Sequence, residues 1–125
     1  MKIYVAHSKE IAYMDELYGP LERSDLAREH EFIFPHKEGK VPFESKVLFE
    51  SGLCKLVLAE VSRSATGLGI ELGWADLLHI PIVCVYRSGS KIGGSLKVVS
   101  KDFIEYESSE DLVKKVQSYL KGCSK

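Results

Sequence analysis

Short apolar runs rich in β-branched residues alternate along the chain with longer segments of helical periodicity. The apolar runs occupy residues 2–6, 31–34, 56–61, 80–86 and 103–106, and the helical segments lie around residues 13–21, 47–53, 67–78 and 112–120. Near-continuous apolar strands that alternate with helices are typical of a parallel sheet covered on both faces. The pattern predicts an open α/β sandwich of about five parallel strands, and 125 residues are enough for one such domain but not for two.

Lysine and arginine total 17 against 18 acidic residues, a formal net charge of −1. Because no basic surface is implied, we expect no nucleic-acid partner. The longest apolar stretches fall far below the roughly 20 residues of a membrane span, and residues 1–6 enter a strand without the apolar region of a signal peptide, so we expect no membrane association. Cys54, Cys84 and Cys123 show no paired metal-ligand spacing, which favours reduced thiols in the cytoplasm over disulfides or a zinc site.

The segment 59–76 is the most informative part of the chain. A buried strand ends near Val61, a turn rich in hydroxyl groups and glycine follows, and a helix starts near Gly67. Gly67 and Gly69 let a ligand approach the backbone, and the free N–H groups of a helix start hold polar or anionic atoms. A dinucleotide-binding fingerprint reads G-x-G-x-x-G after the first strand, whereas here G-x-G-x-x-x-G follows the third, which argues against a Rossmann dehydrogenase.

Glu71 lies about one turn into this helix, where the helix dipole favours an ionised carboxylate. Open parallel sheets bind ligands at the carboxyl ends of their strands, near the point where the strand order reverses. A carboxylate held beside a crevice there suits nucleophilic attack on the anomeric carbon of a sugar. The alternative is an ordinary acid near a helix start, which stabilises the helix by a few tenths of a kcal/mol.

The segment 59–76, the opening strand at residues 3–6 and the segment 81–95 resemble the nucleoside 2-deoxyribosyltransferase family and its relatives, the 2′-deoxynucleoside 5′-monophosphate N-glycosidases. The resemblance implies a flavodoxin-like, Rossmann-like open sandwich. It also implies a homodimer or higher homo-oligomer that needs no metal or cofactor and acts on a small-molecule nucleoside or nucleotide.

The resemblance assigns roles to three residues. Glu71 matches the nucleophile, which displaces the base from C1′ and forms a covalent deoxyribosyl-enzyme that a second base or water then resolves. Tyr4 matches the tyrosine that orients this glutamate, and Ser95 matches a serine that reaches the substrate phosphate from a neighbouring subunit. The leading interpretation is a deoxyribosyltransferase; the alternatives are hydrolysis of a deoxynucleotide, a non-catalytic nucleoside-binding module and, more distantly, a TIR-like domain.

The chain departs from the family at three places. Ala65 replaces the aspartate or serine that contacts the sugar, so a hydroxyl there must come from Ser64 or Thr66. Residues 43–52 lack the aspartate that serves the base, which leaves Glu44 or Glu50 for this role, or a weakly activated leaving group. Residues 7–10 keep a hydroxyl and a cation but lack the glycines of a phosphate-binding loop.

Two histidines fall just past strand ends, on the edge of the sheet where ligands bind. His7 and His36 have side chains whose near-neutral pKa suits proton transfer to a departing base, although loop histidines are more often simply solvated. His36 is the better candidate for the base pocket. We expect the substrate-binding set to comprise His7, Ser8, His36, Ser62, Thr66, Gly67, Gly69 and Ser95, and we expect Ile70 and Trp74 to be packing residues.

Overall fold

The computed structural model describes residues 1–37 and 43–123 and contains a five-stranded, wholly parallel sheet in the order β2-β1-β3-β4-β5. This arrangement confirms the open α/β sandwich, and the strand order is the flavodoxin-like one. The strands are β1 (Lys2–His7), β2 (Glu31–Ile33), β3 (Cys54–Glu60), β4 (Ile82–Arg87) and β5 (Asp102–Tyr106).

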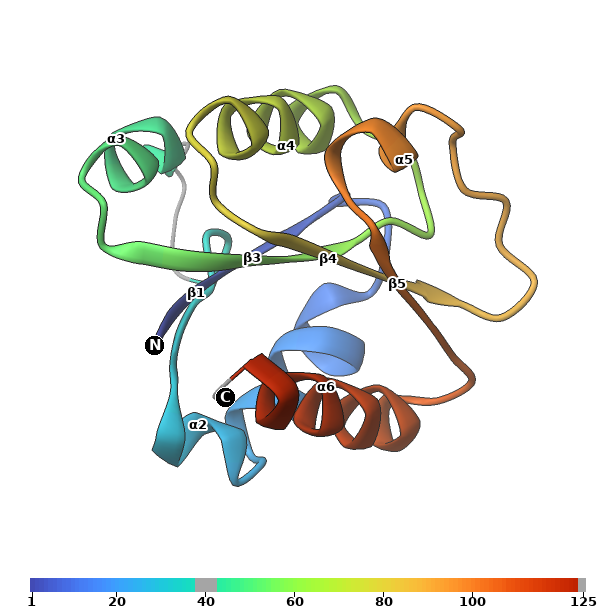
Figure 1. The fold of residues 1–125 in the computed structure, drawn as a ribbon. Coiled ribbons are helices and arrows are strands. Elements are labelled where there is room, and N and C mark those ends of the chain that lie inside the picture. The colour runs from blue at the N-terminus through green and yellow to red at the C-terminus, as the bar shows by residue number, and fades with distance from the viewer. Residues whose placement is uncertain (38–42, 124–125) are drawn as a thin grey trace.

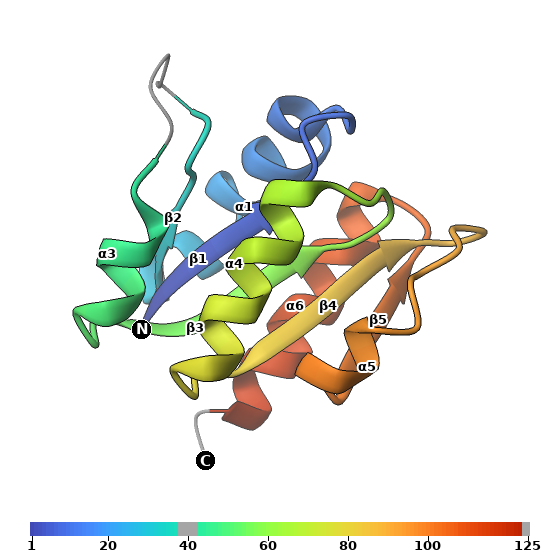
Figure 2. The same cartoon turned by 90° about the horizontal axis from the view of Figure 1, so that it is seen from above.

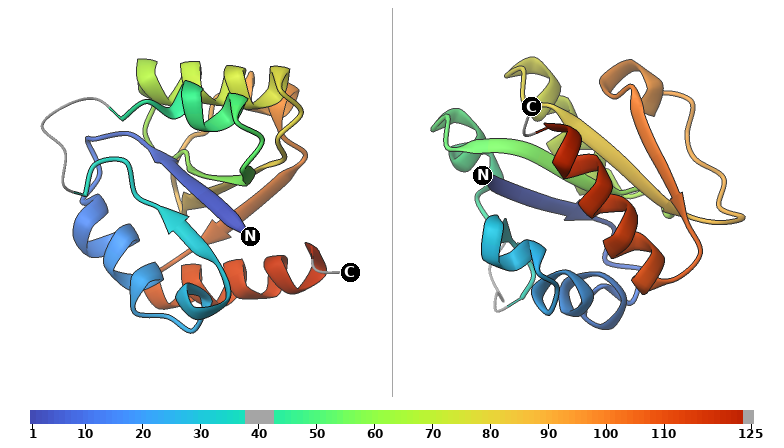
Figure 3. Two further views of the ribbon diagram at one scale, coloured as in Figure 1. Left: turned by 90° about the vertical axis from the view of Figure 1, so that its left-hand side faces the viewer. Right: turned by 60° about the horizontal axis from the view of Figure 1, so that its bottom comes forward.

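Helices cover both faces of the sheet (Figure 1). One face carries the π-helical turn η1 (Met14–Tyr18), α1 (Gly19–Glu22), α2 (Leu26–Glu29) and α6 (Ser109–Cys123). The other carries α3 (Ser45–Glu50), α4 (Thr66–Leu77) and α5 (Leu96–Val99). Figure 3 shows these two helical layers from two further directions.

Alternate residues of each central strand enter opposite cores, which explains why the strands are apolar throughout. In β1, Ile3 and Val5 pack on the face of α6, while Tyr4 and Ala6 pack on the face of α4. All four side chains are almost completely buried. A strand with two buried faces has no solvent side on which polar residues would be placed.

Several element boundaries differ from the expectations. The first helical segment is not one helix but η1 followed by α1, and Pro20 stands in the first turn of α1. Proline has no N–H to continue a helical hydrogen-bond ladder, so the chain restarts there. At the start of α6 the Asp111 N–H donates to Ser108 Oγ at 3.1 Å, and the Asp111 carboxylate accepts the N–H of Glu107.

The strand order creates a switch point between β1 and β3. The chain leaves β1 toward the face of η1 and leaves β3 toward α4 on the opposite face, so the two connections separate at the carboxyl ends of these neighbouring strands. Seen from above, α4 lies over β3, between β1 and β4 (Figure 2). This is the position at which open α/β sheets bind ligands. In the described ranges no helix has the length and hydropathy to cross a bilayer.

Candidate active site

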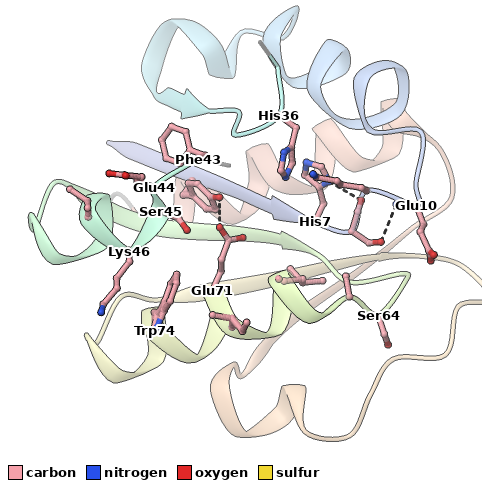
Figure 4. A pocket seen from close by; sticks show the side chains of 18 residues that line it. His7, Glu10, His36, Phe43, Glu44, Ser45, Lys46, Ser64, Glu71 and Trp74 are labelled. Atoms are coloured by element: carbon pink, nitrogen blue, oxygen red, sulfur yellow. Dashed lines mark hydrogen bonds between the residues drawn. The ribbon is translucent and has the colours of Figure 1, made fainter. Parts of the chain in front are cut away.

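A cavity of about 790 Å³ opens at this switch point. Its wall is formed by β1 and the loop after it, by His36, by the segment 43–47, and by the β3–α4 loop with the first turns of α4 (Figure 4). Of the residues expected to act in the site, the cavity brings together Tyr4, His7, Ser8, His36, Gly67 and Glu71. Ser62, Thr66, Gly69 and Ser95 are not among its lining residues.

Glu71 lies at the centre of the cavity wall (Figure 4). The Tyr4 hydroxyl, from the middle of β1, donates to Glu71 Oε2. The side chain of Ser45, the first residue of α3, also hydrogen-bonds the Glu71 carboxylate. Tyr4 is 1% exposed and Ser45 is 3% exposed, so both donors are fixed by the surrounding core.

The electrostatic environment of Glu71 differs from the expected one. Burial raises the pKa of Glu71, and the hydrogen bonds from Ser45 and Tyr4 oppose that rise. Helix α4 begins at Thr66 and has no acidic residue in its first turn, so Glu71 lies in the second turn. Because the helix dipole acts mainly within the first turn, it is the two hydroxyl donors that favour the ionised carboxylate.

Both ring nitrogens of His7 are hydrogen-bonded to neighbouring groups. Nδ1 lies 2.8 Å from the Ser8 carbonyl oxygen, which accepts a hydrogen bond from it, and Nε2 lies 2.5 Å from the Tyr18 hydroxyl. Tyr18 donates to Nε2 while its oxygen accepts the backbone N–H of His36 at 3.1 Å. Burial lowers the pKa of His7 to about 4. The neutral ring therefore ties the β1 loop to η1 and to the segment after β2, and neither nitrogen is free for proton transfer.

His36 faces the cavity beside the hydrogen-bonded side chain of His7 (Figure 4). Its ring stands edge-on to that of His7, with 5.3 Å between centroids, and lies 5.9 Å from the ring of Tyr13. Partial burial and the charge of Lys9 lower the pKa of His36. The imidazole is consequently mostly neutral at physiological pH, so it can contact a ligand but is a weak acid.

Ser62 does not reach the cavity, because a buried carboxylate at the end of β3 binds it. The Ser62 N–H and hydroxyl donate to Glu60 at 2.6 Å and 2.9 Å, and Ser62 Oγ accepts the N–H of Arg87 at 2.8 Å. Glu60 is 2% exposed and also accepts the Tyr106 hydroxyl. Ser62, expected to shape the pocket, thus lies outside the lining of this cavity and fastens the β3–α4 loop to β4.

Three other residues expected in the site lie outside the cavity lining because of their positions in the fold. Thr66 and Gly69 are exposed residues of α4 outside the cavity lining. Ser95 precedes α5, which packs beside α4, and is not among the residues that line the cavity. Gly67 does line the cavity, and a Cβ added there would meet no atom within 4 Å, so the space beside its backbone is open to a ligand.

Apolar and aromatic side chains form a wall that the sequence did not predict. Ile70 and Trp74, expected to be packing residues, lie one turn apart on α4 and line the cavity with Phe43. Ile70 is 46% exposed, and the Lys46 ammonium lies 6.0 Å from the centroid of the Trp74 ring. The sequence of α4 indicates such a wall, because the apolar residues of this helix are not confined to one face.

The two glutamates considered for the missing aspartate are separated. Glu44 lines the cavity, whereas Glu50, at the end of α3, is exposed and outside the lining. Among the residues in the described ranges, no cluster of three or more histidine, cysteine or acidic side chains could hold a metal ion. Cys54 and Cys84 are buried, Cys123 is exposed, and all three are free thiols.

No protein-family model and no curated protein sequence matches the chain. A solved structure does match: the CMP N-glycosidase BcmB from Clostridium botulinum, at 19% sequence identity. The similarity covers 94% of this chain and 99% of that chain, with a TM-score of 0.63. At this identity the likeness shows that the two chains share their fold over nearly their whole length.

Proposed function

We propose that this chain is an enzyme that cleaves the N-glycosidic bond of a nucleoside or nucleotide, with Glu71 as the nucleophile. The observation that carries the proposal is the Tyr4–Glu71 hydrogen bond in the wall of a ligand-sized cavity at the switch point of the sheet. The fold shared with a CMP N-glycosidase supports the same reaction class, as does the resemblance of segment 59–76 to deoxyribosyltransferases.

In the proposed reaction a carboxylate oxygen of Glu71 attacks C1′ as the bond from C1′ to the base nitrogen breaks. The transition state resembles an oxocarbenium ion, and the product is a glycosyl ester of Glu71. The Tyr4 hydroxyl hydrogen-bonds the Oε2 atom of the Glu71 carboxylate and not its Oε1 atom. Attack by a second base on the ester completes a deoxyribosyl transfer, and attack by water completes a hydrolysis.

The cavity offers different surroundings to the two ends of such a substrate. Phe43, Ile70 and Trp74 provide an apolar and aromatic side for a planar base. Ser8 and Lys9, beyond the end of β1, provide a hydroxyl and a cation on the polar side. His36 lies between these regions and can contact the base or the sugar.

The proposal includes a homo-oligomer in which Ser95 of one copy reaches the substrate of another. In a single chain Ser95 is outside the cavity lining, so a role in phosphate binding requires a second copy. Ser95→Ala should then raise KM for a 5′-monophosphate and leave KM for the matching nucleoside unchanged. A monomer by light scattering, with Ser95→Ala equal to wild type, would remove this part of the proposal.

The test of the reaction uses wild type and Glu71→Gln, with Glu50→Gln as the matched exposed control. Each protein is incubated with deoxynucleosides, ribonucleosides and their 5′-monophosphates, with and without free adenine or cytosine, and the products are separated by chromatography. New nucleosides identify a transferase, and free base alone identifies a hydrolase. Ligand-induced thermal stabilisation without turnover would make the chain a binding module and refute the proposal, as would full activity in Glu71→Gln.

A further inference from the structure

We infer that the substrates this site cleaves best carry a positively charged heterocycle at C1′, such as an N-glycosyl pyridinium or an N7-alkylated purine. The inference rests on the proposed function and names its substrate class. It follows from the proton donors around Glu71 and from the charge and aromatic character of the cavity wall.

The fate of the bonding electrons makes the charge of the base important. When the bond from C1′ to nitrogen breaks, its electron pair passes to the ring nitrogen. A neutral base must therefore leave as an anion or receive a proton from a general acid, which typically contributes 10²–10⁴-fold to the rate. A cationic heterocycle becomes a neutral molecule when it takes the pair, and it leaves without any proton.

The hydroxyl and imidazole groups nearest Glu71 are already committed. Tyr4 donates a hydrogen bond to Glu71, and burial together with the neighbouring Glu71 charge raises the pKa of Tyr4, so the phenol retains its proton. Ser45 also hydrogen-bonds Glu71. His7 is neutral, with Nδ1 bound to a carbonyl and Nε2 accepting from Tyr18.

Three further polar groups of the described lining, His36, Glu44 and Lys46, are poorly placed or in the wrong protonation state. Burial and Lys9 lower the pKa of His36, which leaves its ring mostly without a transferable proton at neutral pH. Glu44 is exposed, and Figure 4 shows its side chain projecting away from Glu71. The Lys46 ammonium lies over the Trp74 ring on the outer side of the cavity.

The cavity wall suits a cationic ring in two further ways. Glu44 and Glu71 balance the two cations Lys9 and Lys46, and Glu10 is paired with Arg63 outside the lining, so the wall presents no net positive charge to such a ring. The face of Trp74 already attracts a cation, since the Lys46 ammonium lies 6.0 Å from its centroid. A planar cationic heterocycle is a ligand that such an aromatic face binds.

Matched pairs of substrates test the inference. Guanosine and 7-methylguanosine differ by one methyl group that places a fixed positive charge on the purine, and both are assayed with ribose and with 2′-deoxyribose, as nucleosides and as 5′-monophosphates. Nicotinamide mononucleotide supplies the pyridinium case. We expect kcat/KM for nicotinamide mononucleotide, whose pyridinium charge does not titrate, to stay flat from pH 7 to pH 9, whereas kcat/KM for guanosine falls about tenfold for each pH unit, because its proton must come from solvent.

Variants then locate any enzymatic acid. In Glu44→Gln and His36→Asn the ratio of kcat/KM between 7-methylguanosine and guanosine should equal that of wild type. A loss confined to guanosine in either variant, or a flat profile for guanosine through neutral pH, would overturn the inference while the proposed function stands. If Glu71→Gln cleaves 7-methylguanosine as fast as wild type, or if no compound is cleaved, the proposed function fails as well.

Discussion

Tyr4→Phe is the substitution that isolates the hydrogen bond on which the proposed chemistry depends. The Tyr4 ring is 1% exposed and packs edge-on against Phe49, with 5.2 Å between ring centroids. Phenylalanine keeps this packing and removes only the oxygen that donates to Glu71. Any change in activity therefore reports on the carboxylate and not on the core.

The size of the effect follows from the type of bond. A hydrogen bond to a charged group contributes about 1.5–3 kcal/mol, which corresponds to about 10- to 150-fold in the ratio of ionised to protonated carboxyl. Burial already raises the pKa of Glu71, and the loss of Tyr4 removes one of the two bonds that oppose that rise. On the acid limb of the pH profile kcat/KM should fall by this factor, and the limb should move to higher pH.

The assay is the pH dependence of kcat/KM between pH 5 and pH 9, with any nucleoside that wild type cleaves. The defect of Tyr4→Phe should shrink as the pH rises, because the nucleophile then ionises without the help of the phenol. A defect of the same size at every pH would contradict the reasoning, since it would mean that Tyr4 acts on the substrate or on packing. Circular dichroism and thermal unfolding of the variant control for a folding defect.

Substitutions at Ser45, Glu71 and His7 test the electrostatics of the same region. Ser45→Ala should also move the acid limb of kcat/KM to higher pH and lower kcat/KM there by about tenfold or more, and Ser45→Thr, which keeps the hydroxyl, should restore it. Glu71→Gln should raise the unfolding free energy at pH 7.5 by about 0.5–2 kcal/mol. A carboxyl whose pKa is raised in the folded state loses stability as the pH rises above its ordinary value, so this gain should vanish near pH 4 in urea titrations. His7, with its pKa lowered to about 4, makes acidification from pH 6.5 to pH 4 cost the folded state roughly 3 kcal/mol; His7→Gln should remove that part of the pH dependence, and an unchanged slope would contradict the buried neutral ring.

The fold could be predicted from the sequence because the signal is repeated in every strand. Each central strand has two buried faces, so its apolar run is continuous and easy to recognise. Short helices and helix boundaries could not be predicted in the same way. Helix α5 spans only Leu96–Val99, too few residues to show a period, and Pro20 divides the first helical segment between η1 and α1.

The site was predictable only where position in the topology determines it. Tyr4 and Glu71 are 67 residues apart, and their proximity follows from the adjacency of β1 and β3 together with the resemblance to a known family. Ser45 was overlooked because a hydroxyl at a helix start is common, and its importance arises only from the packing of α3 beside α4. The position of Ser62 outside the cavity depends on the buried carboxylate of Glu60, a partner that its loop sequence does not reveal.

The reactivity of Glu71 is consequently a property of the core as much as of the cavity. The two groups that favour its ionisation come from β1 and α3, and Phe49, a residue of α3 that is 2% exposed, packs against the Tyr4 ring. A helix dipole would act on Glu71 whatever the position of α3, but hydroxyl donors act only at hydrogen-bond distance. Any change that shifts α3 relative to α4 should therefore change the protonation of Glu71, so core substitutions at Phe49 should alter the pH profile of the proposed reaction before they unfold the chain.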